Sequence, residues 1–293
     1  MKIPKGLSSL HTHTLFCDGA DDVETMCLAA FEKGLRAIGF SAHAPIFRAT
    51  GIRTEWHLPD ERLEEYISEV QSARDRWQGK LEVYLGLELD YIRGLRSALD
   101  RDIRALELDY IIGSVHYVVP PTGQPFTVDG TLEEIECGIR EGFGGDGEAL
   151  MHTYWDAVAE MIALGGFDIL GHADIIKKKN HDNRWFNMKS EACQQRMAEI
   201  AAALGRSGLA AEINTGGLNR KRINETFPSL AFVKLFRENQ VPLLISSDAH
   251  CAKDVDGHYE TAWETLRAAG YTDQEIVCQN DTVLGRFSHI RPE

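Results

Sequence analysis

The feature that most constrains the fold of this chain is an alternation of short apolar segments with amphipathic helical segments. The apolar runs are bounded by glycine or polar residues, as buried parallel strands tend to be; they are residues 37–40, 83–86, 110–113, 167–170, 209–213 and 241–245. Helical periodicity occupies residues 22–33, 60–77 and 190–207, with Gly34 and Gly208 as stop signals. Pro242 is expected at the start of its strand, where its missing N–H is tolerated. This alternation predicts a parallel α/β architecture, closed or nearly closed as a barrel.

The chain shows no sign of a second domain. No linker rich in Pro, Ser or Gly divides the 293 residues, and α/β barrels of this size form one unit. We therefore expect a single domain over residues 1–293. Residues 148–164 are expected to form a helix, and residues 120–147, with Pro, Gly and acidic residues, a long excursion over the surface.

Charge and composition restrict the partners. Lys and Arg number 31 against 45 Asp and Glu, a formal charge of -14 that repels phosphate backbones. We expect a small phosphorylated substrate and no nucleic-acid partner. The first residues lack a signal-peptide core, and no window reaches the ~18 apolar residues of a membrane span, which favours a cytoplasmic protein with no membrane partner. The six cysteines are far apart in the sequence and are expected to be reduced thiols. The sequence indicates no oligomeric state.

Histidines and acidic residues follow the ends of the predicted strands. These residues are His11 and His13, His43, Glu88, His116, His172, and Asp248 with His250. Because a parallel barrel brings the carboxyl ends of its strands to one face, the six segments are expected to meet there. Imidazole and carboxylate are ligands of Zn, Mn and Fe. The pattern predicts a metal site.

Spacing supports the metal site at two of these segments. Residues i and i+2 of a strand point to the same side, so His11 with His13, and Asp248 with His250, can hold ions together. The remaining histidines follow no strand run. We expect surface or loop positions for His57, His181, His258 and His289, and a helix-side or pocket-wall position for His152.

The motifs, in this order, resemble the PHP superfamily of metal-dependent phosphoesterases. They are residues 11–14 with Asp18-Gly19, 41–43, 86–88, 113–116, 171–172 and 247–250. The resemblance implies a distorted (β/α)7 barrel with two or three divalent ions (Zn, Mn or Fe) at its carboxyl face. Carried over by position, it implies a first ion on His11, His13, Glu88 and Asp248, with Glu88 bridging to a second ion on His116 and His172. A third ion would take Asp18, with Asp21 as the fallback, together with His43 and His250.

Within the superfamily, the chain resembles the histidinol-phosphate phosphatase branch, on phrases at residues 43–45, 144–146, 154–155, 167–178 and 212–218. Tyr154-Trp155 and Ala173 depart from that branch's more usual residues. The resemblance implies hydrolysis of L-histidinol phosphate in histidine biosynthesis, by a hydroxide that bridges the ions. Glu88, Asp248 and His250 are the catalytic candidates, and the proton donor to the leaving alcohol is left open between Asp248 and a nearby histidine.

Charged residues beyond the ligands are expected to bind the phosphate. Arg220 and Arg222 follow one strand run, and Lys177 and Lys178 follow His172. Asp168 and Asp174 are expected to orient neighbouring imidazoles.

Other functions remain open at this stage. One is a phosphatase for nucleotides or sugar phosphates, or a 3′ exonuclease, although the charge disfavours a nucleic-acid groove. Another is a metal-dependent hydrolase of C–N or C–O bonds. A scaffold with a structural metal is disfavoured. Structural sites are closed and four-coordinate, whereas nine candidate ligands shared by three ions leave open positions.

Overall fold

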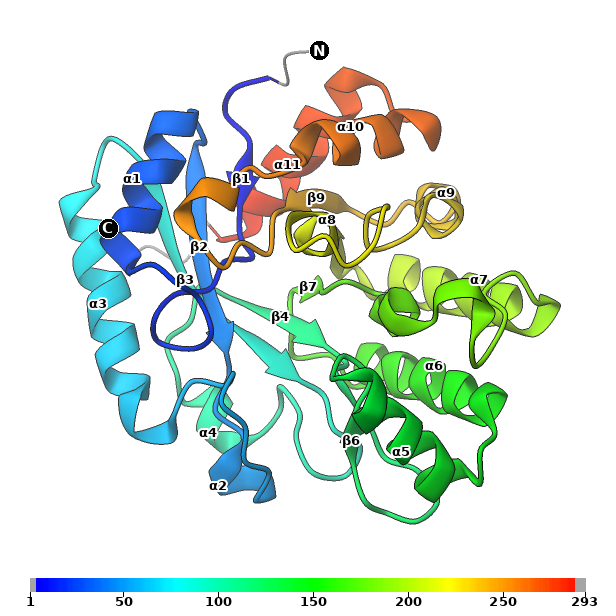
Figure 1. Ribbon diagram of the computed structural model, residues 1–293. Coiled ribbons are helices and arrows are strands. Elements are labelled where there is room, and N and C mark those ends of the chain that lie inside the picture. The colour runs from blue at the N-terminus through cyan, green and yellow to red at the C-terminus, as the bar shows by residue number, and fades with distance from the viewer. Residues whose placement is uncertain (1–3, 288–293) are drawn as a thin grey trace.

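The computed structural model describes residues 4–287 and contains a parallel sheet of seven strands. The strands, in their order across the sheet, are β1 (Ser8–Ser9), β2 (Ala37–His43), β3 (Glu82–Asp90), β4 (Tyr110–Ser114), β7 (Ile169–Leu170), β8 (Ala210–Asn214) and β9 (Leu243–Ser246). Beyond the ends of β1 and β9, the backbone N–H of His13 donates to the carbonyl of Ala249 at 2.8 Å. These contacts bring the two edges together and nearly close the expected (β/α)7 barrel (Figure 1).

Helices surround the barrel (Figure 1). The longer ones are α1 (Val23–Lys33), α3 (Leu63–Arg76), α6 (Gly147–Leu164), α7 (Glu191–Ser207), α9 (Leu230–Glu238), α10 (Tyr259–Ala268) and α11 (Asp273–Phe287). The shorter ones are α2 (Phe47–Thr50), α4 (Arg101–Arg104), α8 (Gly216–Asn219) and the 3-10 turns η1 (Asp60–Arg62), η2 (Ile175–Lys179), η3 (His181–Asn183) and η4 (Ala252–Asp254). Helix α1 begins where Asp22 accepts a hydrogen bond from the Thr25 N–H and ends at Gly34, whose φ of 77° suits glycine. The predicted helices over residues 22–33, 148–164 and 190–207 are confirmed to within a residue at each end.

The prediction for residues 120–147 was wrong in part. This segment contains β6 (Phe126–Thr127), which pairs antiparallel with β5 (Tyr117–Val118), and the helix α5 (Leu132–Phe143). Thr131 and Glu134 form a capping box at the start of α5, and Ile135 and Ile139 form its buried face. The Gly, Pro and acidic content of the segment favoured a loop in the sequence analysis. The Thr-x-x-Glu motif and the isoleucines at i and i+4 indicate the helix.

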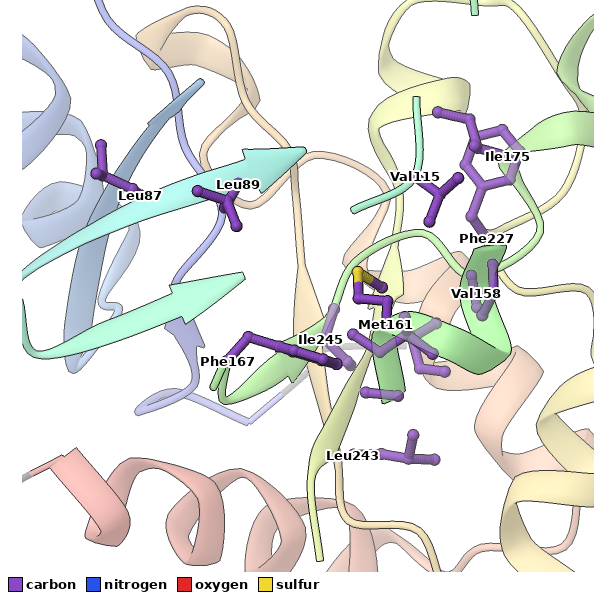
Figure 2. Close-up of a cluster of buried hydrophobic side chains, with 14 of the residues drawn as sticks. Leu87, Leu89, Val115, Val158, Met161, Phe167, Ile175, Phe227, Leu243 and Ile245 are labelled. Atoms are coloured by element: carbon purple, nitrogen blue, oxygen red, sulfur yellow. The ribbon is translucent and has the colours of Figure 1, made fainter. Parts of the chain in front are cut away.

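An apolar layer fills the space between the strands and the helices. Figure 2 shows part of it, with Met161 of α6 beside Phe167, and with Val158 of the same helix and Leu243 and Ile245 of β9. These side chains are buried. The layer holds the strands in a fixed arrangement and so positions the residues at their ends.

The interior of the barrel is packed at the amino ends of the strands. Tyr110 lies across this space and donates a hydrogen bond to the carbonyl of Leu10. A Cβ atom at Gly86 would lie 2.5 Å from the Tyr110 ring, so a residue without a side chain is required there. Phe287 of α11 packs on Tyr110, with ring centroids 5.5 Å apart, and belongs to the same buried cluster. The amino end is therefore filled with apolar side chains, and the polar site lies at the opposite end.

Two further sequence expectations bear on the environment of the protein. Among residues 4–287, no helix combines the length and apolar character that a bilayer span requires. All six cysteines are free in the structure.

Candidate metal centre

The structure brings all nine predicted ligands to the carboxyl ends of the strands. His11 and His13 follow β1, His43 ends β2, Glu88 lies in β3, His116 follows β4, His172 follows β7, Asp18 precedes α1, and Asp248 and His250 follow β9. Asp248 has a φ of 49°, a left-handed conformation that is costly for a side chain other than glycine and is concentrated at functional sites. Side chains from six separate segments of the barrel thus converge on one place.

The ligand atoms form four overlapping groups, and within each group they lie within 4.8 Å of one another. The groups are His11–Glu88–His172, His11–His13–Asp248, His43–Glu88–His116 and His13–Asp18–His43–His250. Because members are shared, the assignment of each residue to a particular ion stays a prediction. Asp21, the fallback for Asp18, belongs to none of these groups; its carboxylate accepts from the backbone N–H of Ala252 at 2.7 Å.

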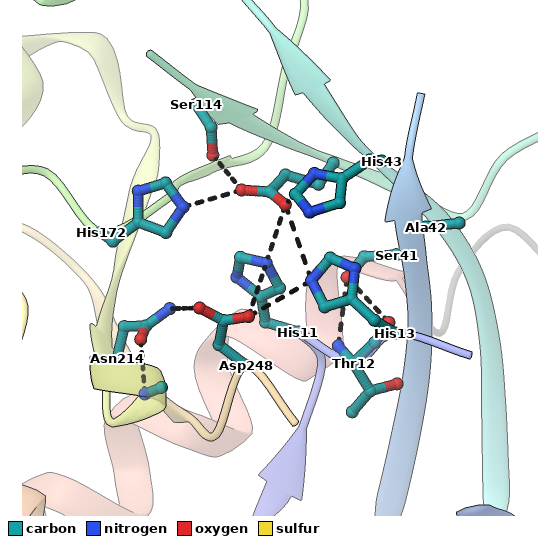
Figure 3. Close-up of polar contacts among 12 residues, drawn as sticks. His11, Thr12, His13, Ser41, Ala42, His43, Ser114, His172, Asn214 and Asp248 are labelled. Carbon is teal, nitrogen blue, oxygen red and sulfur yellow. Dashed lines mark hydrogen bonds and ion pairs between the residues drawn. The ribbon is translucent and has the colours of Figure 1, made fainter. Parts of the chain in front are cut away.

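Figure 3 shows His11, His13, His43 and His172 turned toward a common place, and Glu88 contacts three of these histidines. Its Oε1 accepts a hydrogen bond from the Ser114 hydroxyl at 2.7 Å and lies 2.8 Å from His172 Nε2. Its Oε2 is 2.9 Å from His43 Nδ1 and 3.2 Å from His11 Nε2. One carboxylate therefore faces imidazoles from three other segments, which is the geometry that a bridging ligand needs.

Several polar atoms at the centre are buried and, although they lie close to one another, none is paired in hydrogen-bond geometry within residues 4–287. They are His11 Nε2, His13 Nε2, His43 Nδ1 and Glu88 Oε2. Leaving such atoms unsatisfied costs about 1–3 kcal/mol each. Imidazole nitrogens and a carboxylate oxygen aimed at a common space are ligands for divalent Zn, Mn or Fe. The residues present therefore fit a multi-metal site.

The electrostatics at the centre favour an ionised Glu88 and a neutral His13, whereas burial is outweighed by neighbouring carboxylates that raise the pKa of His11, His43 and His116. Burial, together with the neighbouring His250 and His43, lowers the pKa of His13 to about 3, so its imidazole is neutral. Burial alone would raise the pKa of Glu88, but the imidazoles of His11 and His43 outweigh it and hold the pKa well below its usual range. Neutral imidazole and ionised carboxylate are the forms that coordinate metal ions.

Two buried carboxylates that sequence reasoning missed orient the imidazoles. Glu212 of β8 lies 2.9 Å from His11 Nδ1 and accepts from the backbone N–H of His172 at 2.8 Å. Asp90 of β3 lies 2.8 Å from His116 Nδ1. Such partners fix the tautomer and ring orientation of a ligand. Asp90 stands two residues after Glu88 in the same strand, so the i, i+2 rule could have found it.

The expectation that Asp168 and Asp174 orient imidazoles was wrong. Asp168 accepts from the backbone N–H of Ile111 at 2.8 Å. Asp174 lies 2.9 Å from the Lys177 ammonium and accepts from the Ser229 N–H at 2.9 Å. Both carboxylates hold backbone segments together.

His57 lies in a loop, as expected, but it is buried, and its Nε2 is 2.7 Å from the second carboxylate oxygen of Asp90. His152, His181 and His258 are exposed, as their predicted roles outside the metal site require. His289 lies outside the described residues.

A cleft of about 500 Å³ opens onto the cluster. Arg220, Arg222 and Lys178 line it, as expected of phosphate-binding residues. Arg220 Nη2 donates to Asp248 Oδ2 at 2.9 Å, so the guanidinium is fixed beside the ligands. Lys178 Nζ lies 2.6 Å from Asp129 Oδ1 in the same cleft.

Lys177 does not line this cleft. Its ammonium is buried, 2.9 Å from Asp174 and 3.1 Å from Glu225, and donates to the carbonyl of Thr226. Consecutive residues of the 3-10 turn η2 point in different directions, which a sequence motif of three lysines does not reveal.

Comparisons with known proteins find relatives over most of the chain. The family model described as the PHP domain matches residues 9–216. A probable histidinol-phosphatase of Deinococcus radiodurans is 30% identical over 90% of this chain and 94% of its own length. The histidinol-phosphatase of Bacillus subtilis is 27% identical over 87% of this chain and 97% of its own length.

Solved structures show the same fold. The histidinol phosphate phosphatase of Lactococcus lactis, crystallised with Zn, L-histidinol and phosphate, superposes with a TM-score of 0.67 at 21% identity, covering 92% of this chain and 95% of that one. A Listeria monocytogenes protein assigned as a histidinol phosphatase superposes with a TM-score of 0.77 at 26% identity, covering 87% of this chain and 99% of that one. On the family model, the relatives and the site, the chain belongs to the PHP domain family.

Proposed function

We propose that this protein hydrolyses L-histidinol phosphate to L-histidinol and phosphate, as a metal-dependent phosphomonoesterase of histidine biosynthesis. The observation that carries the proposal is its match, over nearly the whole of both chains, to curated histidinol-phosphatases. The Lactococcus relative holds Zn together with both products of that reaction. We place the reaction in the cytoplasm and take the substrate to be this small ester, without a nucleic-acid or membrane partner.

The proposed metal ligands are the nine residues of the cluster: His11, His13, Asp18, His43, Glu88, His116, His172, Asp248 and His250. Bound divalent cations would neutralise the charge of the phosphate and acidify a water molecule for attack on phosphorus. The central position of Glu88 suits the bridging role.

The protein's own groups would bind the phosphate and handle the proton. Arg220, held by Asp248, presents a planar guanidinium that matches phosphate oxygens, and Arg222 and Lys178 add positive charge in the same cleft. The leaving alkoxide needs a proton, which the attacking water releases. Asp248 and His250, whose Oδ1 and Nδ1 atoms respectively are 3.5 Å apart, are the two groups placed to pass it on.

The proposal is tested by phosphate release from L-histidinol phosphate, beside glycerol phosphate, sugar phosphates, nucleotides and an aryl phosphate. The enzyme is stripped of metal and then given Zn, Mn, Fe or Co separately. We expect metal-dependent turnover with kcat/KM for L-histidinol phosphate ~10²-fold or more above the other esters, about 2.7 kcal/mol. Comparable turnover of another ester would reassign the substrate. No phosphate release with any metal would refute the phosphatase assignment.

A substitution in the cluster sharpens the test. Asp248→Asn removes a ligand charge and the carboxylate that fixes Arg220, so both metal content and turnover should fall. Asp256→Asn is the matched control, because Asp256 pairs on the surface with Lys33 at 2.7 Å.

A further inference from the structure

A second cavity adjoins the cleft over the metal cluster. It is a groove of about 580 Å³ between the loop of residues 51–57, the β5–β6 hairpin and α5. Trp56, Thr127 and Glu134 line both the groove and the cleft, so the two spaces are continuous. In Figure 1 these elements lie together at the lower edge of the molecule, near α2, β6 and α5. A substrate whose phosphate lies at the metal cluster can therefore extend into this groove.

The groove presents an aromatic wall directly beside the cluster. The rings of Trp56 and Tyr117 are stacked, with centroids 5.9 Å apart and an interplanar angle of 11°. The Trp56 ring lies 4.7 Å from the ring of His43 and 5.5 Å from that of His116. Trp56 is only partly buried. An aromatic face at this position can stack on a planar ring or attract a cation.

The wall is held in place by a series of hydrogen bonds, of which the one at Thr54 is partly buried and the one between His57 and Asp90 is buried. The Thr54 hydroxyl lies 2.6 Å from His57 Nδ1, and His57 Nε2 lies 2.7 Å from Asp90, which also holds His116. Trp56 is adjacent to His57 in this loop. These hydrogen bonds fix the wall relative to His116, and therefore relative to the metal cluster.

The two spaces differ in charge. The cleft carries four basic side chains, Lys178, Lys179, Arg220 and Arg222, beside five carboxylates; of these, Asp18, Glu88 and Asp248 are proposed metal ligands, Asp129 pairs with Lys178, and Glu134 is shared with the groove. Cations bound at the proposed ligands would therefore make the cleft positive. The groove carries the carboxylates Glu55, Glu134 and Glu141 against a single arginine. Such a polarity suits a molecule with an anionic phosphate at one end and a cation at the other, and it opposes leaving groups that are themselves anionic.

We infer that this groove binds the leaving group and selects phosphomonoesters whose alcohol carries a planar ring and a cationic amine. Trp56 packs on the ring, and Glu134, which borders the metal cleft, attracts the cation. The inference rests on the proposed function and deepens it, because L-histidinol has both features.

The charge of Glu134 can be removed without disturbing the start of α5. The hydrogen bonds that cap α5 run from Thr131 to Glu134 Oε2, and a glutamine can supply the same acceptor. Glu134→Gln therefore removes the charge and keeps the helix. Glu133→Gln is the matched control, since Glu133 is exposed on the same turn and lines neither space.

The experiment compares kcat/KM for L-histidinol phosphate with that for glycerol phosphate, whose leaving alcohol is neutral. We expect Glu134→Gln and Trp56→Leu each to lower the first ~10-fold and to change the second less than ~2-fold, from the strength of a partly exposed cation–π or charge contact. Trp56→Phe should recover part of the loss. Inhibition by L-histidinol should weaken by the same factor, while inhibition by inorganic phosphate is unchanged.

Equal losses on both esters, or the same loss in Glu133→Gln, would overturn the assignment of the groove. The two proposals fail separately. A wild-type enzyme that leaves L-histidinol phosphate intact refutes the proposed function. In that case the groove is judged by calorimetry of L-histidinol with the metal-loaded protein, and binding that Glu134→Gln does not weaken refutes it.

Discussion

Asp90→Asn isolates the contribution of a carboxylate that touches no substrate. Asp90 is 1% exposed and lies 2.8 Å from His116 Nδ1 and 2.7 Å from His57 Nε2. Asparagine keeps one acceptor oxygen but replaces the other with a donor and removes the charge. A hydrogen bond to a charged group contributes about 1.5–3 kcal/mol, against about 1 for a neutral one. The expected loss is about 1–2 kcal/mol of metal binding at the position that includes His116, or ~5–30-fold in affinity.

The assay is competition between the protein and a chelator of known affinity, with metal content measured on the same samples. Asp168→Asn is the control, because Asp168 is a carboxylate of the barrel that binds a backbone N–H and no imidazole. We expect Asp168→Asn to bind metal as the wild type does. Unchanged affinity in Asp90→Asn, or an equal loss in both variants, would refute the reasoning that Asp90 acts through His116.

Three further predictions concern the centre, the lysines and a helix cap. Chelation should abolish phosphatase activity and lower the melting temperature in thermal scans. The reason is that cations at a free concentration of 100 times their Kd stabilise the folded state by about 2.7 kcal/mol. A melting temperature that chelation leaves unchanged would argue against a metal that binds the folded state. Lys178→Met should raise KM for the ester, whereas Lys177→Met should leave KM unchanged and destabilise the fold by ~3–5 kcal/mol in urea unfolding, since it leaves buried Asp174 unpaired. The reverse pattern would contradict the structural placement. Asp22→Ala should cost about 1 kcal/mol at pH 7 by removing the cap of α1. The hydrogen bond from the Thr25 N–H lowers the pKa of Asp22, so the stabilisation by this cap is present above about pH 4 and is lost as pH falls further. If the loss of unfolding free energy in Asp22→Ala does not shrink in acid, the capping role is contradicted.

The sequence predicted the elements that have strong local signals. Helical periodicity located α1, α6 and α7. Gly34 and Gly208 also marked the ends of α1 and α7, because glycine can end a helix in the left-handed conformation. The position of each histidine or acid after an apolar run placed the cluster, since parallel strands share one carboxyl face. That rule needs only local order along the chain, which is why the convergence of the segments could be foreseen.

Other contacts of the site, unlike that of Asp90 with His116, could not be foreseen in the same way. Glu212 lies inside an apolar run and would be read as a surface residue, yet it is buried against His11, which comes from a strand far away in sequence. The different directions of Lys177 and Lys178 depend on the local turn geometry of η2. Such contacts depend on tertiary packing, which neither periodicity nor composition encodes.

The packing of α11 under the barrel has a consequence for the order of folding. Val283, Leu284 and Phe287 share a buried cluster with Leu10 and Tyr110, so the amino end of the barrel is completed by side chains made after all seven strands. During synthesis the seven strands leave the ribosome before α11 does. Until α11 is made, the amino end of the barrel is unfilled and its apolar surface is exposed. A ribosome-bound chain stopped before residue 273 should therefore be sensitive to protease, and release of the next fifteen residues should protect it.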